Sequence, residues 1–282
     1  MRPSERAATI RVGKSVFTYC KAGVGTPLVL LHGIGSAACA FDDQLAGLSN
    51  DLCAIAWDAP GYGGSTCLEA EAPLARDYAA ALGEFLDALG IAACHLVGHS
   101  LGALMAASFA ADHPERILSL TLASVAAGHA RLAAAERQRL LTQRLSDIAD
   151  LGARQMAEQR GPRLLATNAT PAMTRRVVET MAKVRPDGYS QAARMLAAGD
   201  IMADVARLPA DMRVQYIYGD SDLITPPNRN IEVASLRPGA PVHVVRGAGH
   251  VLYLERPDVF NLLLAEFIAT SGSRAPNLDP AQ

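Results

Sequence analysis

The chain has 282 residues, a formal net charge of −2 at pH 7 and 50% hydrophobic residues. A chain of this length can bury a sizeable core, and α/β folds of this size commonly form one domain that carries an insertion. The small net charge gives no reason to expect nucleic acid or an anionic membrane surface as a partner.

The N-terminal residues and the cysteines bear on location. Residues 1–6 are polar and no apolar stretch follows them, so we expect neither a signal peptide nor a membrane anchor. No later segment approaches membrane-spanning length without charges. The five cysteines are widely spaced, odd in number and free of metal-type pairs. We therefore expect reduced thiols in a cytoplasmic protein with no metal site.

In the first half of the chain, short apolar runs typical of buried strands alternate with helical patterns. Strands are expected at 16–20, 27–31, 52–57, 94–97 and 117–122, and helices near 41–48, 74–89 and 101–111. This alternation predicts an α/β fold, in which a mostly parallel central sheet is flanked by helices and the strands are joined by right-handed crossovers. In such sheets, reactive groups gather where the strands end.

The second half begins with a change of pattern. From residue 128 to residue 206 no β-rich run appears, and three prolines divide the stretch into short helices. We interpret it as a helical cap inserted between the strand at 117–122 and the next strand, at 214–218. A last strand is expected at 242–245 and a closing helix at 257–269. The expected core has two parts, residues 1–127 and 207–270, with the cap at 128–206 between them. Residues 271–282 are expected to be a disordered tail.

A Gly-x-Ser-x-Gly motif joins the strand at 94–97 to the helix that follows. Ser100 lies at its centre, between Gly98 and Gly102. This order is typical of a nucleophile elbow, in which a tight turn holds the serine at φ above 0° and leaves no room for side chains two positions away. We therefore predict that Ser100 is a nucleophile.

A serine hydroxyl needs a base to take its proton, and the base needs an acid to orient it. Of the two histidines after residue 222, His243 lies inside a valine-rich strand, whereas His250 follows the last strand in a Gly-rich loop. His250 is therefore the expected base. Asp220 and Asp222 both follow a strand; we favour Asp222 as the acid, because Asp220 is better placed to hold the turn.

The tetrahedral intermediate also needs backbone N–H donors. We expect one from Leu101, directly after the nucleophile, and one from Ile34, in the loop that begins with His32-Gly33. His32 itself is interpreted as a residue that organises this loop by hydrogen bonding.

These motifs together resemble the α/β-hydrolase superfamily, in its branch of serine hydrolases with a helical cap. The resemblance covers about residues 16–270 and includes the loop at 58–65 as well as the motifs above. Within the superfamily the chain is similar to bacterial enol-lactone hydrolases and carboxylesterases and, more distantly, to meta-cleavage-product hydrolases. The last group usually has Asn before the serine and Trp after the histidine, where this chain has His99 and Val251.

The resemblance implies hydrolysis of a small apolar carboxylic ester or lactone through an acyl-enzyme, with no cofactor. One alternative is a C–C bond hydrolase of ring-fission products that uses the same triad. There a cap arginine would bind a substrate carboxylate, with Arg160, Arg163 and Arg194 as candidates. A remote alternative is a receptor that binds a small ligand without turnover. The sequence leaves a homo-oligomer open.

Overall fold

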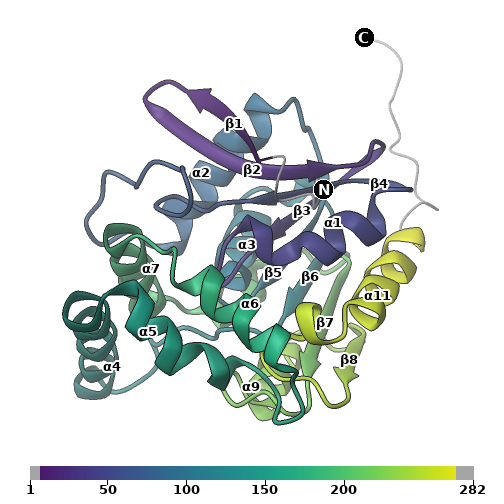
Figure 1. The fold of residues 1–282 in the computed structure, drawn as a ribbon. Coiled ribbons are helices and arrows are strands. Elements are labelled where there is room, and N and C mark those ends of the chain that lie inside the picture. The colour runs from purple at the N-terminus through teal and green to yellow at the C-terminus, as the bar shows by residue number, and fades with distance from the viewer. Residues whose placement is uncertain (1–6, 271–282) are drawn as a thin grey trace, which may run out of the picture.

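The computed structural model describes residues 7–270, and its strands form one eight-stranded sheet in the order β1-β2-β4-β3-β5-β6-β7-β8 (Figure 1). β1 and β2 pair antiparallel and β2 meets β4 antiparallel, while every later pair is parallel. The strands are β1 (Ala7–Val12), β2 (Ser15–Ala22), β3 (Thr26–Leu31), β4 (Leu52–Trp57), β5 (Cys94–His99), β6 (Ile117–Ala123), β7 (Val214–Gly219) and β8 (Val242–Val245). The predicted mostly parallel sheet is therefore confirmed.

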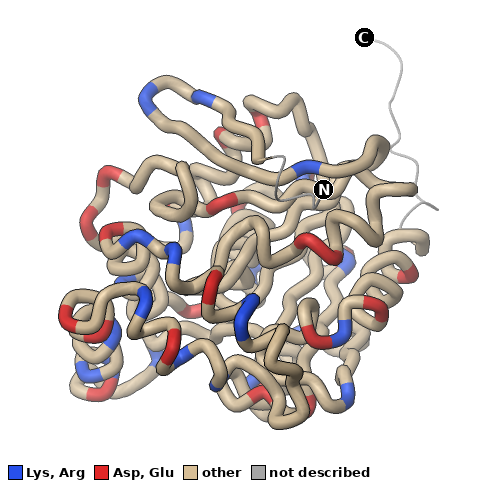
Figure 2. The backbone as a smooth tube through the Cα atoms, in the orientation of Figure 1, with Lys and Arg blue, Asp and Glu red and all other residues tan. Residues whose placement is uncertain are grey.

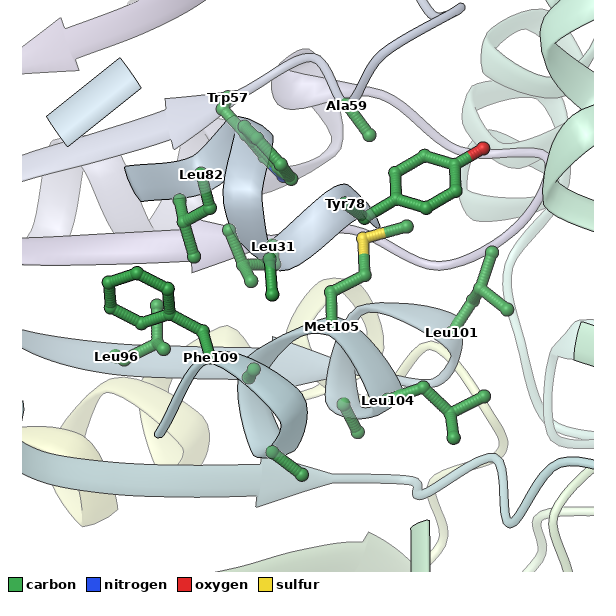
Figure 3. Packing of buried hydrophobic residues seen from close by; sticks show 14 of the residues in the cluster. Leu31, Trp57, Ala59, Tyr78, Leu82, Leu96, Leu101, Leu104, Met105 and Phe109 are labelled. Atoms are coloured by element: carbon green, nitrogen blue, oxygen red, sulfur yellow. The ribbon is translucent and has the colours of Figure 1, made fainter. Parts of the chain in front are cut away.

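The central strands are buried on both faces, which explains their continuous apolar sequences. Alternate residues of β3 belong to opposite cores: Val29 and Leu31 face one, and Leu28 and Leu30 face the other. All four side chains are fully buried. Figure 3 shows the first core, in which Met105 and Phe109 of the helix after β5 lie among side chains of the sheet and of a neighbouring helix.

Helices cover both faces of this sheet, as predicted. α2 (Ala75–Ala88) and α3 (Leu101–Asp112) pack against each other on the first core, and α1 (Asp42–Leu48) and α11 (Pro257–Ala269) pack against each other on the second. Two shorter helices follow the last two strands, α9 (Pro227–Ala234) and α10 (Leu252–Glu255). β1, α9 and α10 lie outside the elements expected from the sequence.

Between β6 and β7 the chain is helical, and we call residues 128–206 the inserted helical segment. It contains α4 (Ala134–Ser146), a π-helical turn (Asp147–Leu151), α5 (Gly152–Arg160), a 3-10 turn (Gly161–Leu164), α6 (Pro171–Met181), α7 (Pro186–Ala198) and all but the last residue of α8 (Ile201–Arg207). Pro171 and Pro186 occupy the first position of α6 and α7, where proline's missing N–H costs nothing. α4 to α7 lie together at one side of the molecule (Figure 1), whereas α8 packs on α3.

Within residues 7–270, no helix has the length and apolarity needed to cross a membrane. The five cysteines are free thiols, three of them buried. The expected polar N-terminus, residues 1–6, and the expected disordered tail, residues 271–282, lie outside the described residues.

Candidate active site

Ser100 lies at the turn between β5 and α3, with φ +55° and ψ −116°. The predicted positive φ is confirmed. The two glycines are required by close backbone approaches. A Cβ at Gly98 would lie 2.5 Å from the carbonyl oxygen of Gly102, and a Cβ at Gly102 would lie 2.3 Å from that of Leu31. The turn thus presses the start of α3 against the end of β3 and leaves the Ser100 side chain on the cavity described below.

His250 bridges Ser100 and Asp222. Its Nε2 lies 2.9 Å from Ser100 Oγ, and its Nδ1 lies 2.9 Å from Asp222 Oδ2. A neutral imidazole that donates from Nδ1 to the carboxylate has an unprotonated Nε2 that accepts from the serine hydroxyl. All three side chains are buried. The fold brings them together from distant parts of the chain, since His250 lies 150 positions after Ser100 and 28 positions after Asp222. This arrangement can remove the proton of an attacking serine.

The structure also separates the two candidate carboxylates. Asp220 Oδ1 accepts hydrogen bonds from Gly247 N and from the hydroxyl of Ser221, so this residue holds the loop that precedes His250. Asp222 points to the imidazole instead. Burial by itself raises the pKa of Asp222, but the facing His250 and the hydrogen bonds that Asp222 accepts outweigh it, and the pKa falls to about 2.

Thr225 supports Asp222 and was missed by the sequence reasoning. Its hydroxyl donates to Asp222 Oδ2 over 2.8 Å and lies 3.2 Å from His250 Nδ1. The other carboxylate oxygen accepts from the backbone N–H groups of Ile224 and Thr225. A threonine three residues after an aspartate at a strand end is the signal in the sequence, since such spacing is typical of a turn closed by the aspartate side chain.

Ile34 and Leu101, the predicted oxyanion donors, line the same cavity as Ser100 and His250. Leu101 is the first residue of α3, where backbone N–H groups have no partner within the helix. Gly33 brings the other loop close: a Cβ there would lie 2.9 Å from Ser100 Cβ. The structure therefore places both residues beside the nucleophile.

His32 organises this loop. Its Nε2 accepts from Ala59 N over 3.1 Å, which leaves Nδ1 to donate to Gly33 O over 2.9 Å. Burial lowers the pKa of His32. A neutral imidazole with both nitrogens engaged is a structural support and not a second base.

His99, directly before the nucleophile, contacts the other histidine. Its Nε2 donates to His250 O over 2.8 Å, and the two rings lie 4.8 Å apart. Burial lowers the pKa of His99 to about 3, and the nearby His250 adds to this effect. His99 therefore stays neutral and fixes the backbone of His250. Sequence reasoning had no signal for this contact, which joins residues 151 positions apart.

A cavity of about 450 Å³ opens beside Ser100 and His250, between the sheet and the inserted helical segment. Both parts supply apolar side chains to its wall: Ile34, Leu101, Val125, Leu132, Leu140, Leu164, Met181, Leu196, Met202, Leu223 and Ile224. This volume fits a small organic molecule with one reacting group at the serine.

Arginines also line the cavity. Three of them form ion pairs: Arg131 with Asp200, Arg160 with Asp147, and Arg229 with Glu232. Arg144 donates to the hydroxyl of Tyr189, and Arg163 has no ion pair with any residue in the described part of the chain. Figure 2 shows acidic and basic positions interspersed along the inserted helical segment, in which twelve Lys and Arg residues outnumber eight Asp and Glu residues.

Comparisons with known proteins identify the fold family of the chain. A family model described as the alpha/beta hydrolase fold matches residues 26–257. The dihydrolipoyllysine-residue acetyltransferase component of the acetoin cleaving system from Cupriavidus necator is 30% identical over 89% of this chain, which spans 66% of that protein's length, slightly less than two thirds.

Two further proteins match over nearly their full length. The (E)-2-((N-methylformamido)methylene)succinate hydrolase of Acinetobacter baylyi is 25% identical, with 90% of this chain and 94% of that protein covered. The crystal structure of the enol-lactonase from Burkholderia xenovorans LB400 superimposes with a TM-score of 0.82 at 21% identity and covers 93% of this chain and 100% of that one. At that identity the structural likeness establishes the fold.

Proposed function

The chain belongs to the α/β-hydrolase fold family, and we propose that it is a serine hydrolase that cleaves a small carboxylic ester or lactone. The observation that carries the proposal is the imidazole of His250, placed 2.9 Å from Ser100 Oγ on one side and 2.9 Å from Asp222 Oδ2 on the other.

In the first half of the reaction, Ser100 Oγ attacks the carbonyl carbon while its proton passes to His250 Nε2. Asp222 keeps Nδ1 protonated and stabilises the imidazolium that forms. The backbone N–H groups of Ile34 and Leu101 hold the oxyanion, and each such donor typically contributes about 3 kcal/mol. The imidazolium then protonates the leaving alkoxide, and the acyl group remains on Ser100.

In the second half, water attacks the acyl-enzyme. His250 Nε2 takes a proton from the water and returns it to Ser100 Oγ as the tetrahedral intermediate collapses. The carboxylic acid leaves, and the triad regains its starting protonation. With a lactone, the acid and the alcohol leave as one molecule.

We further propose that the inserted helical segment is a cap over this site, between core parts 1–127 and 207–270. The apolar wall that it shares with the sheet supports a substrate with a compact hydrocarbon portion. Met181 and Met202 supply flexible apolar side chains to this wall. A lactone substrate also fits the likeness to the enol-lactonase from Burkholderia xenovorans LB400, which matches over its full length.

The C–C hydrolase alternative retains one supporting observation. Of the three arginines considered for a substrate carboxylate, Arg160 pairs with Asp147 and Arg194 pairs with Glu71, whereas Arg163 lines the cavity without an ion pair in the described part of the chain. The Acinetobacter relative is named as the hydrolase of a succinate derivative, which carries carboxylates.

A panel of short-chain aryl esters, γ- and δ-lactones and dienone ring-fission products separates these functions. The proposal predicts turnover of an ester or lactone by the wild type and none by Ser100→Ala. Rapid quenching should trap an acyl adduct on Ser100 by intact mass. Turnover of the dienone alone would replace the proposal with the C–C hydrolase, and binding without turnover of any class would favour the receptor.

A further inference from the structure

The loop that carries His250 rests on the inserted helical segment. The carbonyl oxygen of Leu164 accepts hydrogen bonds from His250 N over 2.8 Å and from Val251 N over 3.3 Å. The contact is equally tight one residue earlier in the loop, because a Cβ at Gly249 would lie 2.6 Å from Ala166 N. The chain at 164–166, the residues that end the 3-10 turn and follow it, is therefore part of the wall that holds the histidine.

One buried carboxylate joins the same two pieces of chain. Glu255, the last residue of α10, is 7% exposed. Its Oε1 accepts from Gly249 N over 2.9 Å, and its Oε2 accepts from Ala166 N over 2.8 Å. Burial raises the pKa of Glu255, and these two hydrogen bonds oppose that shift. Both oxygens are thus committed to backbone N–H groups, one directly before the histidine and one in the inserted helical segment.

Glu255 takes no part in the proposed reaction. Burying a carboxylate is costly unless hydrogen bonds or ion pairs replace its lost hydration, and here two backbone N–H groups do so. Glu255 does not line the catalytic cavity, whereas Leu164 and His250 both do. Leu164 therefore lines the proposed substrate space and also holds the histidine backbone through its carbonyl group. A displacement of residues 164–166 would reach His250 through Leu164 O and through the Glu255 carboxylate.

We infer that Glu255 is a positioning residue, which keeps His250 within hydrogen-bonding distance of Ser100 by tying the histidine loop to residues 164–166 of the inserted helical segment. The inference rests on the proposed function, since it assigns Glu255 a role in holding the proposed base. The inserted helical segment then has two tasks: it closes the cavity, and it supports the base.

The first test is Glu255→Gln, which keeps the shape of the side chain but turns one acceptor into a donor. Facing two N–H donors, the amide leaves one of them without an acceptor and loosens the loop. Because a displacement of about 1 Å in a catalytic group can cost about 100-fold in rate, we expect kcat to fall at least about 10-fold. The labelling rate of Ser100 by a fluorophosphonate should fall by the same factor, with KM within about twofold, because the cavity is untouched.

The second variant removes the donor of the hydrogen bond from Ala166 N to the Glu255 carboxylate. Ala166→Pro deletes the N–H that donates to Glu255 Oε2, and the proline ring takes the place of that hydrogen, so the carboxylate has to move away from residue 166. Leu165 already has φ −105° and ψ 152°, the extended conformation that a residue before proline prefers. We expect the same loss in kcat, and a double variant no slower than the slower single one, because both changes break one connection.

The matched control is Glu266→Gln, at an exposed glutamate of α11, which should keep the wild-type kcat, KM and labelling rate. Circular dichroism checks that each variant is folded. The inference is wrong if folded Glu255→Gln keeps both rates within about twofold of wild type, or if the two losses multiply in the double variant. Failure of the proposed triad is distinguishable, since wild-type protein would then show no labelling at all, whereas a different substrate class would leave the labelling comparison intact.

Discussion

Gly102→Ala tests whether the close approach of α3 to β3 positions the oxyanion donors. Gly102 is the second residue of α3, directly after Leu101, and Leu31 is the last residue of β3, shortly before Ile34. A Cβ at position 102 would meet the carbonyl oxygen of Leu31 at 2.3 Å and its carbonyl carbon at 2.7 Å. Both are backbone atoms, so no side-chain rotation relieves the clash.

Ordinary van der Waals contact begins at 3.4 Å, so the helix and the strand must separate by about 1 Å. Overpacking of this kind typically costs about 1–3 kcal/mol of unfolding free energy, and the better helix propensity of alanine returns up to about 1 kcal/mol. The same separation moves the Leu101 and Ile34 N–H groups apart. A misplacement of about 1 Å lowers a rate about 100-fold, which corresponds to about 2.7 kcal/mol in the barrier.

Urea unfolding followed by circular dichroism gives the first quantity, and the second-order rate of fluorophosphonate labelling gives the second. Gly83→Ala is the matched control: Gly83 lies inside α2, and its Cβ would meet only Phe109 Cε2, at 3.6 Å. We expect this control to gain about 0.5–1 kcal/mol and to keep the wild-type labelling rate. If Gly102→Ala is as stable and as reactive as wild type, the reasoning about the elbow is refuted.

Asp222→Asn should lower kcat by up to about 10⁴-fold with little change in KM, because an amide that donates to Nδ1 holds the wrong tautomer of the imidazole; activity above a tenth of wild type would contradict the role of Asp222. Thr225→Val removes the hydroxyl that donates to Asp222 Oδ2, and we expect kcat to fall about 10-fold; an unchanged kcat in folded protein would show that the backbone N–H groups suffice. Burial lowers the pKa of His95 from 6.5 to about 4. Between these pH values the unfolded chain binds a proton at His95 and the folded protein does not, so the unfolding free energy should fall as pH drops from 6.5 to 4. His95→Asn should reduce this loss by up to about 1.4 kcal/mol per pH unit; an unchanged slope in urea titrations at these pH values would refute the assignment.

The strands of the parallel sheet could be predicted because they are buried on both faces and therefore read as continuous apolar runs. β4 begins and ends at the predicted residues, and β8 does as well. β1 carried no such signal. None of its side chains is fully buried, and it pairs with β2 alone. α10 was too short to show a helical period, and α9 begins with Pro-Asn-Arg-Asn, in which the asparagines are weak helix formers.

Some residues of the candidate site could likewise be predicted from the sequence, and others could not. The elbow could be predicted from local sequence, because Gly98, Ser100 and Gly102 act within one turn. His99 and Glu255 could not be assigned, because their roles depend on contacts with residues distant in the chain. Thr225 contacts Asp222 only three residues away, so its turn spacing was present in the sequence and was overlooked. The cavity wall was equally out of reach, since its side chains come from several helices of the inserted segment and from the sheet.

The central claim is that His250 and Asp222 activate Ser100, and intact mass after fluorophosphonate treatment tests it most directly. The probe forms a bond from phosphorus to an activated serine Oγ and releases fluoride. We predict one adduct on the wild type, none on Ser100→Ala, and labelling of His250→Ala slowed by at least about 100-fold. An adduct that persists on Ser100→Ala, or a folded wild type that neither reacts with the probe nor hydrolyses a small ester, would contradict the account.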